Sequence, residues 1–212
     1  MVAPLLGIAE RRLGHILTSR VQVEPVIALH GPRSVGKSTL LATLAAAQHV
    51  PVLDLDDPET REVVLANLTL AVGQYTPLCV DEYQHVPLVL DAIKARMNRD
   101  GARPGTAVLT GSTRQDSLPR TAQALTGRLH TMTIWPLSQG EIAGVVEDVL
   151  LALRDDPDAA VRSRPTSTTA RESYVDRVCA GGFPRRCDEA PRNGTAGSTT
   201  TSAKPSSGTR SS

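Results

Sequence analysis

The run GPRSVGKS at residues 31–38 constrains the fold of this 212-residue chain more than any other feature. It matches the pattern GxxxxGK[ST], in which glycines let a backbone loop wrap around a phosphate group. An apolar run, Val26–His30, precedes the loop, and a Leu- and Ala-rich run at 38–48 follows it. This order predicts a strand, a phosphate-binding loop and a helix whose N-terminal end faces the phosphate.

Short apolar runs alternate with helix-like runs up to about residue 150. The patterns predict strands at 26–30, 50–55, 78–80, 106–110 and 130–134, and helices at 38–48, 57–66, 88–98 and 140–153. Within 88–98, Leu88, Ile93 and Met97 are predicted to form the apolar side. Such alternation is typical of a parallel sheet with crossover helices. We therefore predict an α/β fold with a central, mostly parallel sheet.

The chain divides unevenly into four predicted parts. Residues 1–25 are predicted to hold an N-terminal helix with Leu5, Ile8, Leu13 and Ile16 on its apolar face, and residues 26–153 a P-loop ATPase core. Residues 154–190 are predicted to form a partial helical extension with a helix at 171–180. Residues 191–212 are predicted to be a disordered C-terminal tail, because Ser, Thr, Gly and Pro give this run little to bury.

The overall composition bears on partners and compartment. The chain has 23 Lys and Arg against 22 Asp and Glu, so no strong positive field indicates nucleic acid as a partner. Cys79 lies in an apolar run and is predicted to be a small buried residue, and Cys179 and Cys187 are too few and too widely spaced for a zinc site. A disulfide framework is not indicated either, which favours a reducing, cytoplasmic setting. No run approaches the length of a membrane span.

The loop chemistry predicts how a nucleotide is bound. Lys37 is expected to reach the β- and γ-phosphates of ATP, and the Ser38 hydroxyl to ligate Mg²⁺. The predicted nucleotide-binding residues are Gly31, Pro32, Arg33, Ser34, Val35, Gly36, Lys37, Ser38 and Thr39.

Two acids end the strand predicted at 78–80. In P-loop enzymes the first acid at this position binds Mg²⁺, which predicts that role for Asp81. The second, Glu82, can orient and deprotonate an attacking water molecule. The end of the next strand, at Thr110 or Ser112, is a candidate γ-phosphate contact, although an ordinary strand-to-loop turn fits equally well.

Other polar residues are weaker candidates. Arg128 could supply charge to the transition state, in cis or to a neighbouring subunit, but most arginines lie on the surface or in ion pairs. Capping and turn roles are favoured for Asp54, Asp56 and Asp57, and structural roles for His30 and His85.

The ordered series of motifs resembles a mostly uncharacterised group of prokaryotic AAA-superfamily ATPases that carry a C-terminal domain of unknown function. The matching runs are HGPRSVGKST, LDLDDPETR, VDEYQHVPLVLDAIK, VLTGSTR, LTGRL, WPLSQGEI and GGFP. The resemblance implies an ATP-binding domain with the P-loop NTPase fold, a three-layer sandwich in which helices cover both faces of the central parallel sheet. It also implies Lys37 and Ser38 on phosphate and Mg²⁺, with Asp81 and Glu82 as the metal and water acids. The group more often has a smaller residue where Tyr83 precedes Gln84.

The sequence departs from that group after the GGFP run at 181–184, where the group continues into a second domain. We hypothesise that a reading-frame shift near residues 184–186 replaced that domain. One choice of codons for residues 197–205 reads Trp-Phe-Asp-Asp-Tyr-Val-Ser-Gln-Thr in the neighbouring frame, which resembles the group's sequence. A natural low-complexity tail is the alternative, and sequencing the gene decides between them.

The sequence thus predicts a Mg²⁺-dependent ATPase that forms ADP and phosphate. A non-catalytic nucleotide-dependent switch or interaction module is one alternative, and a P-loop kinase is another, although no acceptor site is evident. The sequence is compatible with a protein partner or a homo-oligomer and identifies neither.

Overall fold

A computed structural model of the chain describes residues 11–112, 125, 127–145, 148–162 and 170–184. Its centre is a five-stranded sheet in which every strand pair is parallel, in the order β2-β3-β4-β1-β5. The strands are β1 (Val26–His30), β2 (Val52–Asp54), β3 (Leu78–Asp81), β4 (Ala107–Gly111) and β5 (Leu129–Thr133). The predicted α/β fold is confirmed, and β2 is shorter than the run predicted at 50–55.

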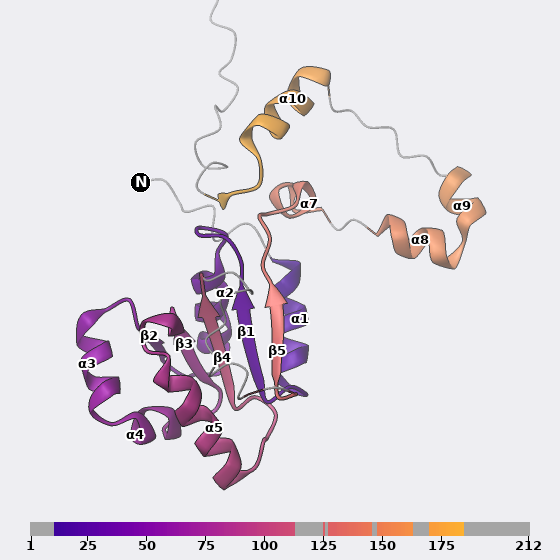
Figure 1. Cartoon of the computed structure of the whole chain (residues 1–212). Coiled ribbons are helices and arrows are strands. Elements are labelled where there is room, and N and C mark those ends of the chain that lie inside the picture. Colours follow the sequence, from indigo (N-terminus) through magenta and orange to yellow (C-terminus); the bar gives the residue numbers. More distant parts are fainter. Residues whose placement is uncertain (1–10, 113–124, 126, 146–147, 163–169, 185–212) are drawn as a thin grey trace, which may run out of the picture.

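Helices cover both faces of this sheet (Figure 1). One face carries α1 (Arg12–Val21) and α2 (Lys37–Ala47), and the other carries α3 (Pro58–Ala66), α4 (Leu68–Gly73) and α5 (Leu88–Asp100). Successive strand residues point to opposite faces. In β3, Leu78 and Val80 therefore pack under α5, while Cys79 packs under α2. The predicted three-layer sandwich is confirmed, and Cys79 is buried as predicted.

Local signals define most helix ends. The Asp57 carboxylate accepts the Thr60 N–H at 2.9 Å, and Pro58 occupies the first position of α3, as the sequence predicted. Asn67 both ends α3 and caps α4 by accepting the Leu70 N–H. The sequence analysis missed α4 and the short 3₁₀ helix η2 (Tyr83–His85).

Three sequence predictions need correction. The helix predicted at 140–153 is two helices, α7 (Gln139–Ala143) and α8 (Val149–Asp155). Gly144, with a φ of 65°, ends α7, and the next N–H, of Val145, donates to the Gly140 carbonyl at 2.9 Å. This is the bond pattern of a Schellman C-cap, which a left-handed glycine favours.

The other two corrections concern helix faces. Ile16 is 47% exposed, because α1 buries Leu17 and Val21, with Leu13 partly buried one turn earlier. The predicted Leu5 and Ile8 lie outside the described residues. Leu88 is 52% exposed at the start of α5, whose buried side consists of Val89, Leu90, Ile93 and Met97.

Two more helices follow α8 in the described chain. They are α9 (Pro157–Arg162) and α10 (Arg171–Ala180), and α10 has the bounds that the sequence predicted. None of the described residues of α8, α9 or α10 is buried. The predicted tail at 191–212 lies outside the described residues. In the described part of the chain, no helix has the length and apolar character to cross a membrane.

Candidate nucleotide-binding and hydrolytic site

The glycine-rich loop leaves the sheet where β1 ends and runs into the first turn of α2. Gly31 and Gly36 have φ angles of 155° and 93°, which glycine adopts without the steric cost of a side chain. A β-carbon on Gly31 would lie 2.2 Å from the Ile134 carbonyl oxygen. Ser34 also has a positive φ, of 63°. The loop therefore depends on glycine for its backbone conformation and, at Gly31, for its close approach to the segment after β5.

Lys37 turns back over the start of this loop. Its Nζ donates to the carbonyl oxygens of Gly31 at 3.0 Å and Pro32 at 2.9 Å. Burial lowers the pKa of the Lys37 ammonium, whereas the negative charges of Glu82 and Asp81 raise it. The ammonium is thus fixed inside the loop and lies within the electrostatic reach of both acids.

Polar groups of the loop and the first turn of α2 face outward. Pro32, Arg33, Ser34, Ser38 and Thr39 are exposed, whereas Val35 is buried. The first N–H groups of a helix have no acceptor within that helix, and they carry its partial positive charge. This surface can therefore bind an anionic group such as a phosphate.

The two predicted acids lie at the same edge of the sheet as the loop. Strand β4 separates β3 from β1, and parallel pairing places the carboxyl ends of all three together. The Asp81 side chain accepts the Thr110 hydroxyl of β4, and the Glu82 N–H donates to the Asp81 Oδ1 atom at 3.1 Å. Thr110 is fully buried, so it fixes the Asp81 carboxylate from within the sheet.

Glu82 lies just beyond β3 in a left-handed conformation, with φ 51° and ψ 48°. This conformation is rare for a residue with a long side chain. The Glu82 Oε2 atom accepts the Ser112 hydroxyl at 3.3 Å and also the side-chain amide of Gln84. The structure thus brings together Glu82 and Ser112, which were predicted separately, and adds Gln84, which was not predicted as a site residue.

Arg128 does not reach this site. It directly precedes β5, whose first residue, Leu129, pairs with Val26 at the beginning of β1. Arg128 therefore lies at the amino edge of the sheet, opposite the loop, where its Nη1 donates to the Asn98 Oδ1 atom at 3.0 Å. The predicted role in cis is wrong for this structure, and only the role toward a neighbouring subunit stays a prediction.

A second residue that the sequence analysis missed, Arg11, contacts the loop from outside. Its guanidinium donates to the Val35 carbonyl oxygen and, at 2.9 Å, to that of Trp135. The same group lies 3.6 Å from the Glu141 carboxylate. Burial lowers the pKa of Arg11, and the charge of Glu141 raises it. Arg11 therefore links the phosphate-binding loop to the segment after β5.

That segment contains the WPLSQGEI run, and it also contacts the GGFP run. Ser138 and Glu141 form a capping box at the start of α7, with bonds of 2.9 and 3.1 Å. The Leu137 N–H donates to the Gly182 carbonyl at 2.7 Å, and a β-carbon on Gly182 would lie 2.1 Å from the Leu137 oxygen. The structure thus brings two motifs that are distant from each other in the sequence, WPLSQGEI and GGFP, to one side of the loop.

The oxygen donors at this edge fit Mg²⁺, which prefers hard oxygen ligands and binds few protein groups when a phosphate supplies others. These donors are the exposed Ser38 hydroxyl and the Asp81 carboxylate. The two belong to one site, because the negative charge of Asp81 raises the pKa of Lys37, the residue next to Ser38. Within the described ranges, no cluster of three or more His, Cys, Asp or Glu residues suits a metal bound by protein alone.

The sequence profile of one protein family, described as an AAA domain, matches residues 23–143. The chain belongs to this AAA domain family. The matched region includes all five strands, the glycine-rich loop and both acids. The resemblance predicted from the order of the motifs is therefore confirmed, and the chain is a P-loop domain of the AAA superfamily.

Relatives of this AAA domain include two uncharacterised proteins, from Mycobacterium bovis and Mycobacterium tuberculosis. Each is 27% identical over 156 residues, which cover 71% of this chain and 34% of the relative. The chain thus spans about a third of the length of these curated relatives. Among solved structures, the crystal structure of a DNA replication initiation factor matches with a TM-score of 0.51 at 12% identity, covering 89% of this chain and 60% of that one. This likeness shows the fold.

Proposed function

We propose that this AAA domain binds ATP with Mg²⁺ and hydrolyses it to ADP and phosphate. Lys37 and the N–H groups of the loop and of the first turn of α2 hold the phosphates, and Glu82 activates the attacking water. Ser38 and Asp81 hold Mg²⁺, which neutralises charge on the phosphate oxygens when it is bound. Ser112 supports Glu82, because its hydroxyl donates to the Glu82 carboxylate.

One observation carries this proposal: the charged groups that hydrolysis requires meet at one edge of the sheet. Lys37 begins α2, directly after the loop, and its pKa responds to the negative charges of Asp81, which ends β3, and Glu82, which follows it. The Asp81 carboxylate is buried and bonded to Thr110, whereas Glu82 is only half-buried. A half-buried carboxylate next to a phosphate-binding loop is accessible to water, as a general base must be.

The bonds at Glu82 also support its role as a base. The side-chain bonds that the structure shows to this carboxylate both end on its Oε2 atom. The Oε1 atom is left to accept a proton from the water that attacks the γ-phosphate. Catalysis of this kind depends on positioning and on charge stabilisation, since the protein forms no covalent bond to the phosphate.

Phosphate release from ATP by the purified chain, with and without Mg²⁺, tests this proposal. Glu82→Gln keeps the size of the side chain but removes the base, and general-base catalysis is worth about 10²- to 10⁴-fold. We expect kcat to fall by about that factor, while binding of a fluorescent ATP analogue persists. Lys37→Ala is expected to lose binding as well, because it removes the cation inside the loop.

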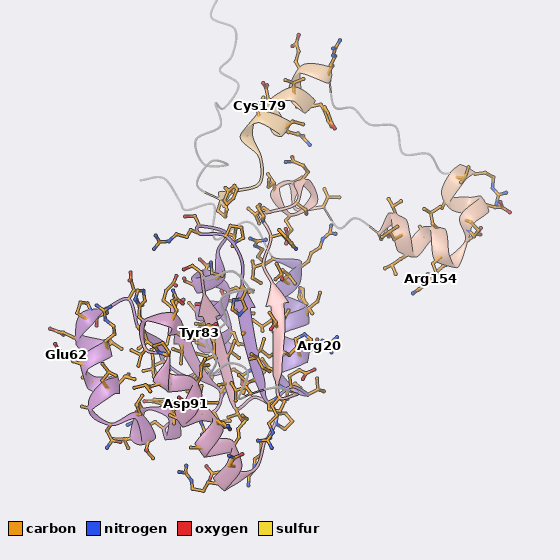
Figure 2. The ribbon with its side chains drawn as sticks, viewed as in Figure 1. Arg20, Glu62, Tyr83, Asp91, Arg154 and Cys179 are labelled. Atoms are coloured by element: carbon orange, nitrogen blue, oxygen red, sulfur yellow. The ribbon has the colours of Figure 1, made fainter. Side chains whose placement is uncertain are left out.

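Glu62→Gln provides the matched control. Glu62 lies on the exposed side of α3 and points away from the sheet (Figure 2). The same chemical change is expected to leave turnover unaltered there. Equal phosphate release by wild type and Glu82→Gln would contradict the proposed mechanism. Saturable ATP binding without turnover would instead indicate the nucleotide-dependent switch, and transfer of the γ-phosphate to an added acceptor would indicate the kinase.

A further inference from the structure

Gln84 contacts the same carboxylate oxygen as Ser112. Its Nε2 atom donates to the Glu82 Oε2 atom and lies 3.2 Å from the Ser112 hydroxyl oxygen. The three side chains therefore form a closed triangle, since the Ser112 hydroxyl oxygen lies 3.3 Å from the Glu82 Oε2 atom. None of the residues that the sequence analysis assigned to nucleotide binding belongs to η2, the element that supplies Gln84.

The backbone places Gln84 in this position. The left-handed conformation of Glu82 turns the chain sharply after β3, and η2 (Tyr83–His85) returns it toward the end of β4. Gly111 of β4 makes the approach sterically feasible. A β-carbon there would lie 2.8 Å from the Tyr83 Cε1 atom and 2.9 Å from the Gln84 Oε1 atom. The absence of a side chain at residue 111 thus leaves room for the Gln84 amide beside the strand.

The orientation of this amide follows from the bond to Glu82. The Gln84 Oε1 atom is buried, and no hydrogen-bond partner for it occurs in the part of the chain that the structure describes. A buried acceptor without a partner is costly. The reverse orientation would set the amide oxygen against the Glu82 carboxylate, with two acceptors facing each other. The bond from the Gln84 Nε2 atom to Glu82 therefore fixes the orientation of the amide, although its oxygen then has no partner among the described residues.

From these contacts we infer that Gln84 is a positioning residue for the catalytic base, an inference that rests on the proposed hydrolysis. Gln84 and Ser112 fix the Oε2 atom, so the Oε1 atom points in one direction and the attacking water is held in line with the γ-phosphate. Gln84 itself touches neither the loop residues nor Lys37 by any bond that the structure shows. Its loss is therefore expected to impair the chemical step and to spare nucleotide binding.

Two variants test the inference in the full chain. Gln84→Leu removes the donor at similar volume, and Gln84→Glu replaces the donor by a second carboxylate at the same shape. Misplacing a catalytic group by about 1 Å can cost about 10²-fold in rate. We expect both variants to lower kcat by about 10- to 10²-fold, Gln84→Glu the more strongly, with KM unchanged. Gln84→Asn, which keeps the amide on a shorter side chain, is expected to retain more activity than Gln84→Leu.

Exposed Gln74, which follows α4, provides the matched control, and Gln74→Leu is expected to leave kcat unchanged. A second readout needs no turnover. Transition-state analogues depend on the positioned water and base, whereas ground-state analogues do not. Gln84→Leu is therefore expected to weaken binding of Mg²⁺–ADP–aluminium fluoride by about 10-fold or more, and to leave binding of Mg²⁺ with a non-hydrolysable ATP analogue unchanged.

The outcomes separate this inference from the proposed function. If wild type turns over, Glu82→Gln does not, and Gln84→Leu behaves like wild type, the role of Gln84 is refuted and the ATPase stands. If wild type shows no turnover, the proposed ATPase activity is refuted. The role of Gln84 is then decided by the affinity for Mg²⁺–ADP–aluminium fluoride divided by the affinity for the non-hydrolysable ATP analogue. A ratio that Gln84→Leu leaves unchanged overturns the inference. Equal loss of both affinities, with a lowered Tm, also overturns it, because this result indicates a purely structural role.

Discussion

Replacing Arg11 by methionine tests how the region outside the phosphate-binding loop supports it. Methionine has a similar unbranched stem but no charge and no donors. The change removes the bonds from Arg11 to the carbonyls of Val35 and Trp135 and the 3.6 Å ion pair with Glu141. The side chains of Arg11 and Glu141 are only 12% and 8% exposed, so water replaces these contacts poorly.

The expected cost follows from these contacts. Removing one partner of a buried ion pair costs about 3–5 kcal/mol, and a hydrogen bond from a charged donor contributes about 1.5–3 kcal/mol. Two facts reduce the sum. Trp135 is 66% exposed as a residue, so water has some access to that end of the contact. Glu141 also keeps two backbone donors, the N–H groups of Arg12 and Ser138. We therefore expect the free energy of unfolding to fall by about 2–4 kcal/mol.

Urea unfolding followed by far-ultraviolet circular dichroism measures this change, provided that the slope of the transition is the same in both proteins. Arg154→Met is the matched control. The Arg154 side chain is 69% exposed, and within the described ranges its ion pair is with its neighbour Asp155 alone, so its loss is expected to cost less than about 0.5 kcal/mol. An Arg11→Met protein within about 0.5 kcal/mol of wild type would refute the reasoning. The free energy of unfolding of Arg11→Lys is expected to lie between those of wild type and Arg11→Met, because lysine keeps the charge without the planar pair of donors.

Three further predictions concern single residues. Gly31→Ala is expected to destabilise the chain and abolish binding of a fluorescent ATP analogue, because its β-carbon would collide with a backbone oxygen. Burial raises the pKa of Cys79 to about 11, so iodoacetamide near neutral pH is expected to modify exposed Cys179 and not Cys79, as peptide mass spectrometry can show. The hydrogen bond from the Thr60 side chain lowers the pKa of Asp57, so the ionised carboxylate stabilises the folded chain at neutral pH. Asp57→Asn is therefore expected to lower the free energy of unfolding at neutral pH. Urea titrations at decreasing pH are expected to show this difference from wild type vanish as the pH falls through the folded-state pKa of Asp57.

The sequence predicted the parts of the site that depend on local pattern. The spacing of Gly31, Gly36 and Lys37 requires a strand, a loop and a helix, and the structure contains all three in that order. The parallel sheet then brings Asp81 and Glu82 to the same edge, because strands joined by crossover helices end on one side. The parallel direction of the strands therefore follows from the alternation of strands and helices, whereas the strand order β2-β3-β4-β1-β5 comes from the structure.

Contacts between common residue types could not be predicted in the same way. Arg11 contacts Trp135 across 124 positions of sequence, and nothing in the run around Arg11 distinguishes it from a surface arginine. Arg128 is the reverse case, because the sequence analysis considered it as a weaker candidate for the phosphates, whereas the strand register places it at the far edge of the sheet. Sequence spacing reports which side chains share an element, but it does not report which end of the sheet each one reaches.

The backbone at Glu82 shows why some of the site is hidden from sequence. A left-handed conformation at a residue other than glycine costs on the order of 1–3 kcal/mol, and it persists only where the surroundings fix it. Here the Glu82 N–H bonds to Asp81 and Thr110, and the carboxylate bonds to Gln84 and Ser112. These bonds offset the strain and fix the direction of the side chain together. A polar residue two positions after the acid and a hydroxyl at the end of the next strand are therefore parts of one arrangement, although each is unremarkable in the sequence by itself.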